Sequence, residues 1–317
     1  MKICLIIPCY NEEESIKILY NELCETIKEI NNYRVELLFI DDGSQDNTLE
    51  IIQNISNSDI RVKFISFSRN FGKESAILAG LRFAKGDYIG VLDADLQHPP
   101  FALINMIEAL EEGYDIAAAR RIDRNGEKKT YSWFARSFYK AINMMSQIKI
   151  HEGAQDFRIM KRKVVKAIIN MPEYHRFSKG IFSWVGFKTK WFEHENRERV
   201  AGTTKWSFAK SCRYAIDGII SFSTMPLRIS LLTGFIVSMF GFVYALYIVI
   251  KTLILGSDWP GFPTITSLIL IMSGFILLSL GIIGEYISRI YTEVKNRPIY
   301  IIDKTNIVFE EQSNERY

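Results

Sequence analysis

Several features that mark common protein classes are absent from this sequence or rare in it. Its 317 residues include four cysteines, at positions 4, 9, 24 and 212, and none belongs to a Cys-x-x-Cys pair. A disulfide scaffold is therefore excluded, and we expect reduced thiols in a cytosolic compartment. The four histidines lack the spacing of metal ligands. The net charge of +3 is too small over this length to indicate a nucleic-acid partner.

Familiar nucleotide-binding and hydrolase motifs are also missing. The sequence contains neither G-x-G-x-x-G nor G-x-S-x-G. Gly72-Lys73 does not complete a Walker motif, because Phe67 stands at the first glycine position. NAD-dependent oxidoreductases, P-loop ATPases and serine hydrolases are therefore disfavoured. A signal peptide is not expected, since the first apolar run ends at Pro8 and acidic residues follow soon after.

What the sequence does contain is two long apolar runs in its C-terminal third. Residues 229–250 and 262–284 carry no charged side chain, and each is long enough to cross about 30 Å of hydrocarbon. Lys and Arg flank the pair on both outer sides, whereas the connector 251–261 holds one Lys and one Asp. The runs are predicted to cross the plasma membrane with both ends in the cytoplasm. The alternative is a pair of buried helices in a soluble core.

The first 120 residues alternate apolar runs with amphipathic stretches. Strands are predicted at 3–8, 35–40, 62–67, 88–92 and 116–119, and helices near 13–29, 47–55, 74–84 and 100–112. Strands that alternate with helices form a mostly parallel sheet covered on both faces, so the predicted fold class is α/β. Ligands of such sheets bind beyond the carboxyl ends of the strands.

Polar clusters follow three of the predicted strands, at residues 8–13, 41–44 and 93–97. Asp93, Asp95 and Gln97 offer the hard oxygen ligands that Mg²⁺ or Mn²⁺ takes, usually together with substrate phosphates. Asp41 and Asp42 are suited to accept hydrogen bonds from a ribose hydroxyl or a base edge. A nucleoside diphosphate fits all three clusters. The ordinary alternatives are a solvated turn at the third cluster and an Asx turn at the second.

Eight segments together carry a family resemblance: PCYNEE, DDGS, SFSRNFGKE, DADLQHPP, QDFRIMKRKVV, RFSKG, RVAGTTKW and the late LSLGIIGEYISRIY. From Ile3 to near Asp303, the sequence resembles the membrane-anchored polyprenyl-phosphate glycosyltransferases of glycosyltransferase family 2. That group includes bacterial undecaprenyl-phosphate glucosyl- and N-acetylglucosaminyl-transferases and, more distantly, dolichol-phosphate mannose synthase. The resemblance implies a Rossmann-like glycosyltransferase A-type domain with a mostly parallel sheet, then juxtamembrane helices and a two-helix transmembrane hairpin.

The resemblance also implies a reaction and its partners. A UDP-sugar, carrying glucose or N-acetylglucosamine, would donate its sugar with inversion to undecaprenyl phosphate at the cytoplasmic face of the bilayer, with Mg²⁺ or Mn²⁺ as cofactor. Family members are often homo-oligomers. The family pattern places these residues around the nucleotide sugar: Pro8, Tyr10, Glu12, Ile40, Asp42 and Ala94. It places Asp93, Asp95 and Gln97 at the metal, and Arg199 and Lys205 on a loop that closes over the diphosphate.

The acceptor phosphate sets the catalytic requirement. Its second pKa is about 6, so at neutral pH it is largely a dianion and already a nucleophile. The harder task is to hold two anions together, for which Arg121 and Arg136 are the candidates, while Arg124 reads as a surface residue. Asp156 matches the family aspartate near the reacting centre. We interpret it as a positioning group, with a general base or a cap of a helix at 158–169 as alternatives.

Residues 129–140 and 205–228 mix aromatic with basic side chains, as helices at a membrane surface do, although ordinary core helices share this composition. We predict a cytoplasmic glycosyltransferase domain over residues 1–226, a hairpin over 227–290 and a cytoplasmic tail over 291–317. Two other functions stay open. One is a synthase acting on a saccharide acceptor, disfavoured because no Q-x-x-R-W motif occurs. The other is a non-enzymatic membrane subunit that binds nucleotide sugars, disfavoured by the intact metal-ligand set.

Overall fold

The computed structural model describes residues 1–30, 32–121, 143–145, 151, 153–171, 173–194, 217–255 and 261–308. The described strands are β1 (Lys2–Cys9), β2 (Arg34–Asp41), β3 (Val62–Phe67), β4 (Tyr88–Val91), β5 (Ile116–Arg121), β6 (Ala154–Lys161), β7 (Thr189–His194) and β8 (Ile302–Thr305). The described helices are α1 (Ile16–Glu29), α2 (Thr48–Ser58), α3 (Lys73–Phe83), α4 (Ala102–Glu111), α6 (Arg162–Ile169), α7 (Ser178–Trp184), α9 (Met225–Leu255) and α10 (Phe262–Val294).

All the described strands join one sheet in the order β7-β5-β6-β4-β1-β2-β3-β8. The pairs β1–β2, β1–β4, β2–β3 and β5–β7 are parallel. β6 is antiparallel to β4 and β5, and β8 is antiparallel to β3. The predicted α/β class with a mostly parallel sheet is confirmed, and the five predicted strands correspond to β1–β5.

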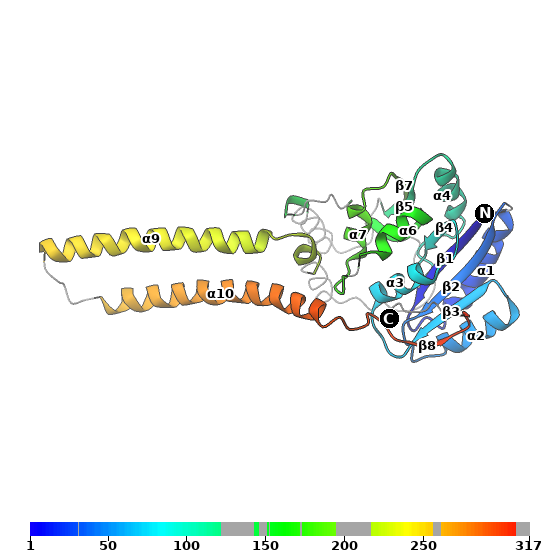
Figure 1. Cartoon of the computed structure of the whole chain (residues 1–317), viewed down its shortest axis with the longest axis horizontal. Coiled ribbons are helices and arrows are strands. Elements are labelled where there is room, and N and C mark those ends of the chain that lie inside the picture. Colours follow the sequence, from blue (N-terminus) through cyan, green and yellow to red (C-terminus); the bar gives the residue numbers. More distant parts are fainter. Residues whose placement is uncertain are drawn as a thin grey trace.

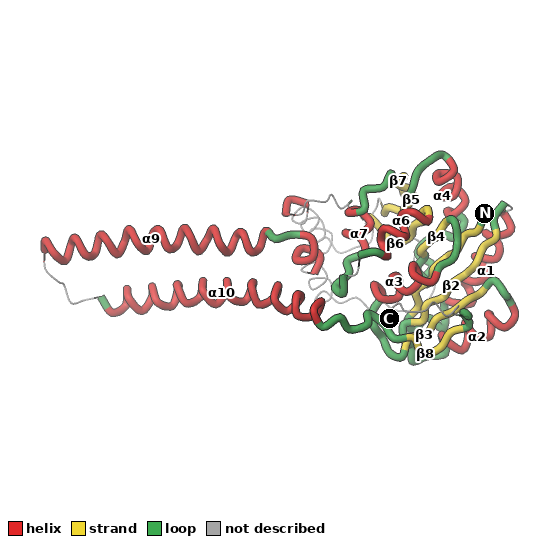
Figure 2. Tube along the Cα trace, in the orientation of Figure 1, coloured by secondary structure: helices red, strands yellow, loops and turns green. Residues whose placement is uncertain are grey.

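Helices cover both faces of the sheet (Figure 2), which explains why its inner strands are nearly continuous apolar runs. Successive side chains of β2 point to opposite faces. Phe39 packs with Leu23 of α1 and Met106 of α4 in one core. Its neighbour Ile40 packs with Ile77 of α3 in the other. The alternation therefore assigns α1, α2 and α4 to one layer and α3, α6 and α7 to the other.

The helices α9 and α10 extend together away from the sheet (Figure 1). Met225–Ile248 and Ile271–Val294 are each long and apolar enough to cross a membrane, and neither stretch is buried. Large side chains such as Leu231, Phe242 and Leu277 are 75%, 71% and 69% exposed. The alternative of two buried helices in a soluble core is therefore wrong, because these helices have no core around them.

The base of this hairpin is attached to the sheet domain by side-chain contacts. Phe222, in the helical residues 217–222, packs against Phe177 with ring centroids 6.1 Å apart. The backbone N–H of Tyr174 donates to Glu293 Oε1 of α10 at 2.8 Å. The hydroxyl of Tyr286, also in α10, donates to the carbonyl oxygen of Ser223 at 2.6 Å.

After α10 the chain returns to the sheet and supplies its edge strand, β8. The side chain of Asn306 accepts a hydrogen bond from the N–H of Phe64 at 2.9 Å and donates one to the carbonyl of Val62 at 3.1 Å. Tyr300 stacks on Phe67 with ring centroids 5.0 Å apart. Part of the segment 291–317, which the sequence analysis treated as a tail, is thus a structural element of the sheet.

Candidate active site

The carboxyl ends of β1, β2 and β4 lie at one edge of the sheet, so the structure brings the three polar clusters to the same place. Pro8 of β1 pairs with Ile40 of β2, and the first two clusters begin just beyond this pair. β5 runs antiparallel to β6, which runs antiparallel to β4. β5 is therefore parallel to β4, and its last residue, Arg121, lies at the same edge.

The turn after β1, with Tyr10 and Glu12, is hydrogen-bonded to the segment after β2. The N–H of Asn11 donates to Ser44 Oγ at 2.9 Å, and the N–H of Glu12 donates to Thr48 Oγ1 at 2.7 Å. Asn11 has a φ of 52°, a left-handed conformation that asparagine tolerates better than most residues. These bonds fix the first two polar clusters relative to each other.

The Asp42 carboxylate is held by the loop that follows β3. Its Oδ1 accepts the N–H of Phe71 at 2.6 Å, and its Oδ2 accepts the N–H of Gly72 at 2.9 Å. Gly43 permits this close approach, since its φ is 66° and a Cβ there would lie 2.4 Å from the carbonyl carbon of Arg69. Burial raises the pKa of the Asp42 carboxyl to about 6, although the two N–H groups oppose the shift. Each oxygen keeps lone-pair capacity for a further donor.

Asp41 has a different task from its neighbour. Its Oδ1 accepts the N–H of Ser44 at 3.1 Å, and its Oδ2 accepts the hydroxyl of Ser66 at 2.7 Å. Asp41 therefore stabilises the turn itself. Of the two aspartates, Asp42 is the better candidate for contact with a nucleoside.

The third cluster follows β4 directly. The N–H of Gln97 donates to Asp95 Oδ1 at 3.2 Å, which closes a tight turn in which Leu96 has a φ of 59°. Ala94 is 4% exposed and packs in the core with α1 and α4. Any contact of Ala94 with a ligand would therefore come from its backbone.

Asp156 lies in β6, opposite the third cluster. The β4–β6 ladder ends at the pair Val91 and Arg158, and Asp93 and Asp156 each lie two residues beyond that pair. Lys73, the first residue of α3, lies between the two carboxylates: its Nζ is 2.6 Å from Asp93 Oδ1 and 2.6 Å from Asp156 Oδ2. The helix-cap interpretation of Asp156 is wrong, because the buried apolar side chains at 157, 159 and 160 extend strand β6 to Lys161.

The electrostatics of this pair bear on the role of Asp156. Burial by itself would raise the pKa of the Asp156 carboxyl, but Lys73, with Lys179 and Arg158 nearby, holds that pKa well below its usual range. The two carboxylates likewise outweigh burial and raise the pKa of Lys73. A carboxylate with so low a pKa is a weak proton acceptor. This arrangement favours a positioning role over a general base.

Sequence reasoning missed Lys73 and Glu74. The Glu74 carboxylate accepts the backbone N–H of Ser178 at 3.1 Å and also its hydroxyl, which ties α3 to the start of α7. Burial raises the pKa of Glu74. The sequence did carry a signal for these two residues. Strand β3 ends at the same carboxyl edge of the sheet as β1, β2 and β4, and the segment SFSRNFGKE begins in β3 and continues past its end.

Arg124, Arg136, Arg199 and Lys205 lie outside the described residues, as do residues 129–140 and 205–216 of the predicted interface segments. The backbone of Arg121 is described and its side chain is not. Cys4, Cys9 and Cys24 are free thiols.

The chain was compared with known families and proteins. Residues 4–169 match the family described as Glycosyl transferase family 2, and residues 225–290 match the GtrB C-terminal hairpin. The chain belongs to glycosyltransferase family 2. Its family 2 match begins in β1 and ends with α6, so it contains Asp42, Asp93 and Asp156. The hairpin match covers α9 and most of α10, in keeping with association of this glycosyltransferase with a membrane.

Relatives extend the similarity over nearly the whole glycosyltransferase. It is 45% identical over 305 residues to the putative glycosyltransferase CsbB of Bacillus subtilis (strain 168), covering 96% of this chain and 92% of that protein. It is 44% identical over 306 residues to the bactoprenol glucosyl transferase of Shigella phage SfII, covering 96% and 99%. One similar solved structure is the glucosyl-3-phosphoglycerate synthase of Mycobacterium tuberculosis with Mn²⁺, UDP-glucose and phosphoglyceric acid, at TM-score 0.45, 17% identity and coverage of 69% and 77%.

The third cluster of this glycosyltransferase suits a cation that arrives with its substrate. Within the described part of the chain, no three His, Cys, Asp or Glu side chains form a ready metal cage. Mg²⁺ rarely needs one, because it is usually held by one or two carboxylates plus substrate phosphates and water. Asp93 and Asp95 supply two carboxylates in one turn, and the ammonium of Lys73 already pairs with Asp93. These donors fit a divalent metal carried by a diphosphate.

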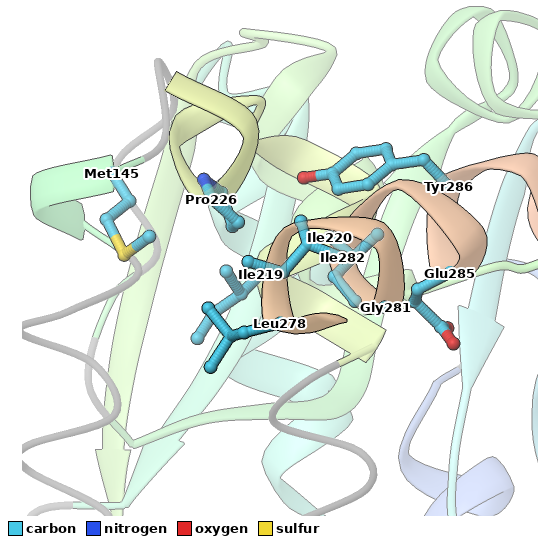
Figure 3. A pocket seen from close by; sticks show the side chains of 9 residues that line it. All are labelled: Met145, Ile219, Ile220, Pro226, Leu278, Gly281, Ile282, Glu285 and Tyr286. Atoms are coloured by element: carbon cyan, nitrogen blue, oxygen red, sulfur yellow. The ribbon is translucent and has the colours of Figure 1, made fainter. Parts of the chain in front are cut away.

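An apolar pocket of about 500 Å³ lies at the base of the hairpin (Figure 3). Its walls are formed mainly by Ile219 and Ile220, by Pro226 at the start of α9, and by Leu278 and Gly281 of α10. Such a lining suits a hydrocarbon ligand far better than a sugar or a nucleotide.

Proposed function

We propose that this glycosyltransferase moves a glucosyl group, with inversion, from UDP-glucose to a polyprenyl phosphate such as undecaprenyl phosphate. The observation that carries the proposal is the facing pair Asp93 and Asp156, at the sheet edge that also holds Asp42, in a chain whose apolar hairpin begins beside an apolar pocket. The relatives named bactoprenol glucosyl transferase support glucose as the sugar and a polyprenyl carrier as the acceptor.

The donor would bind along the carboxyl edge of the sheet. Asp42, backed by the loop at 69–72, would accept a hydrogen bond from the nucleoside, with these neighbours around it: Pro8, Tyr10, Glu12, Ile40 and the backbone of Ala94. Asp93, Asp95 and Gln97 would hold Mg²⁺ or Mn²⁺. When bound, the metal would stabilise the negative charge that develops on the leaving diphosphate. Arg199 and Lys205 would close over the same diphosphate.

The acceptor phosphate needs positioning more than it needs deprotonation. As a dianion it attacks the sugar without a general base. Asp156, ion-paired with Lys73 and opposite Asp93, would orient the groups around the reacting carbon. Arg121, at the end of β5, and Arg136 would offset the charge of the acceptor phosphate.

The topology of the sheet supports a double crossing of the membrane by the hairpin. β3 and β8 pair in one sheet, so the chain between them crosses any membrane an even number of times. The two candidate crossings in the described residues are α9 and α10. The N-terminal end of α9 and the C-terminal end of α10 lie on the side of the sheet domain. We assign that side to the cytoplasm because Lys and Arg flank those ends, at Arg228, Arg289, Lys295 and Arg297.

The pocket at the base of the hairpin would receive the acceptor's first isoprene units. It lies where the spans meet the sheet domain, between helical residues 217–222 and α10. A chain bound there would emerge among lipids on one side and present its phosphate toward the sheet domain on the other. This arrangement would bring a hydrophobic acceptor to a hydrophilic donor without removing the lipid from the bilayer.

The test is transfer of radiolabelled sugar by the full-length protein in detergent. UDP-glucose and UDP-N-acetylglucosamine are supplied separately with undecaprenyl phosphate, in Mg²⁺, in Mn²⁺ and in EDTA. The expected result is an organic-extractable glucosyl lipid that forms with metal and not in EDTA. Product from UDP-N-acetylglucosamine alone would correct the sugar. Transfer to a saccharide without lipid product would favour the synthase, and UDP binding without any transfer would favour the non-enzymatic subunit.

A further inference from the structure

Lys73 forms an ion-pair bridge between two carboxylates of the candidate site. Neither core packing nor the proposed chemistry accounts for this bridge. Its ammonium lies 2.6 Å from an oxygen of Asp93 and 2.6 Å from an oxygen of Asp156. Asp93 lies in the turn that follows β4, and Asp156 lies in β6, the strand that pairs with β4. Without a cation between them, they would repel each other at close range.

The exposure of the three side chains shows that the bridge is open on one side. The side chains of Asp93 and Asp156 are 21% and 15% exposed, whereas that of Lys73 is 43% exposed. Partly exposed ion pairs contribute little to stability, so stabilisation alone does not account for this bridge. Lysine is also a compact charge on a flexible stem, so it can leave one carboxylate and keep the other without backbone movement. Lys179 and Arg158 add positive charge near Asp156.

We infer that Lys73 is a placeholder cation: its ammonium pairs with Asp93 until metal and nucleotide diphosphate arrive together, and then moves to the diphosphate while staying near Asp156. The inference rests on the proposed function, because it requires a metal-bound diphosphate at Asp93. It makes Lys73 a positioning residue that keeps the carboxylates of the empty site paired and so keeps their geometry.

The placeholder has a measurable consequence, namely coupling between metal and nucleotide. A metal ion that binds alone must displace the Lys73 ammonium from Asp93, and the ammonium then has no carboxylate partner in place of Asp93. A metal ion that binds with UDP gives the ammonium a new anionic partner, so displacement is less costly. UDP therefore raises the affinity for metal, and by linkage metal raises the affinity for UDP by the same factor. Removing the ammonium should strengthen binding of metal alone and weaken this coupling.

The experiment measures Mn²⁺ binding to the full-length protein in detergent by electron paramagnetic resonance, with and without UDP. Protein-free samples correct for Mn²⁺ bound by UDP itself. In Lys73→Met we expect Mn²⁺ alone to bind at least fivefold more tightly than in wild type, and the enhancement by UDP to shrink by a similar factor. Lys73→Arg keeps a positive charge, and arginine forms stronger, bidentate hydrogen bonds with carboxylates. Mn²⁺ alone should therefore bind more weakly to this variant than to wild type. The two variants test the inference in opposite directions.

Lys179→Met is the matched control. It removes one positive charge that acts on Asp156, but Lys179 makes no ion pair with Asp93 in the described structure. Its coupling between Mn²⁺ and UDP should stay within twofold of wild type. Melting curves add a second readout, because Mn²⁺ should raise the Tm of Lys73→Met more than that of wild type.

Two kinds of outcome separate this inference from the proposed function. If wild type transfers glucose only with metal, but Lys73→Met binds Mn²⁺ as wild type does, the placeholder is refuted and the function stands. An effect of Lys179→Met as large as that of Lys73→Met would also refute it, because general charge would then explain the result. If wild type binds UDP and transfers glucose equally well in EDTA, the metal-dependent function fails and the placeholder fails with it.

Discussion

Binding of the nucleoside should weaken as the pH falls through about 6, where Asp42 takes up a proton. Its carboxylate already accepts the N–H groups of Phe71 and Gly72, and only the ionised form keeps full acceptor capacity for a nucleoside as well. If the ionised form alone binds, affinity at pH 5 is about tenfold lower than at pH 7. An aspartate with an ordinary pKa near 3.9 would remain almost fully ionised over this range.

The assay should use uridine rather than UDP as the ligand. The second pKa of a phosphate is also about 6, so UDP would add its own titration to that of the protein. Calorimetric titration of the full-length protein with uridine, between pH 5 and pH 7.5, isolates the protein's contribution. Asp42→Asn is the control, since its uridine affinity should be weak and should not change with pH.

The reasoning is refuted if the uridine affinity of wild type is constant between pH 5 and pH 7. Asp42 would then either not contact the nucleoside or not have a raised pKa. A pH dependence that persists unchanged in Asp42→Asn would instead assign the titration to another group. Only a tenfold loss that disappears in the variant supports the burial of Asp42 as its cause.

Three further predictions concern other parts of the chain. Asp156→Asn should lower kcat by about 100-fold and change the Kd for UDP less than threefold, because positioning is lost; full activity would contradict a catalytic role. Gly281→Leu should fill the pocket and raise the KM for lipid acceptor, whereas Gly284→Leu, on the same helix and outside the pocket, should not. A Cβ added at either glycine would meet no atom within 4 Å. Asn306→Ala should cost about 1–3 kcal/mol of unfolding free energy, seen as a lower Tm, because the N–H of Phe64 loses its partner.

The part of the fold that follows from local periodicity was predictable. The runs that became β1–β5 alternate with amphipathic helices, and that pattern indicates a parallel sheet with its ligands at one edge. One alternative for Asp156 placed a helix at 158–169, whereas residues 158–161 belong to β6. Its identity as a strand depends on pairing with β4 and β5, which no local pattern records.

Some residues of the candidate site could likewise be predicted from the sequence, and others could not. Asp42, Asp93 and Asp156 could be named because they lie in recognisable motifs. Asp41 stabilises a turn, whereas Asp42 faces the 69–72 loop. This difference depends on Gly43, because the absence of a side chain there lets the backbone of Arg69 approach closely. Lys73 escaped notice for a similar reason, since its contacts join three segments that are distant in the sequence.

The pairing of β8 with β3 has a consequence for how the protein is made. Synthesis proceeds from the N-terminus, so β3 exists long before residues 302–305 leave the ribosome. Until then its outer edge presents unpaired N–H and C=O groups, which are a template for aggregation. Both apolar helices are synthesised during this interval. The sheet can therefore be completed only after the hairpin has been made, and a chain cut just after α10 would have its spans but an unprotected strand edge.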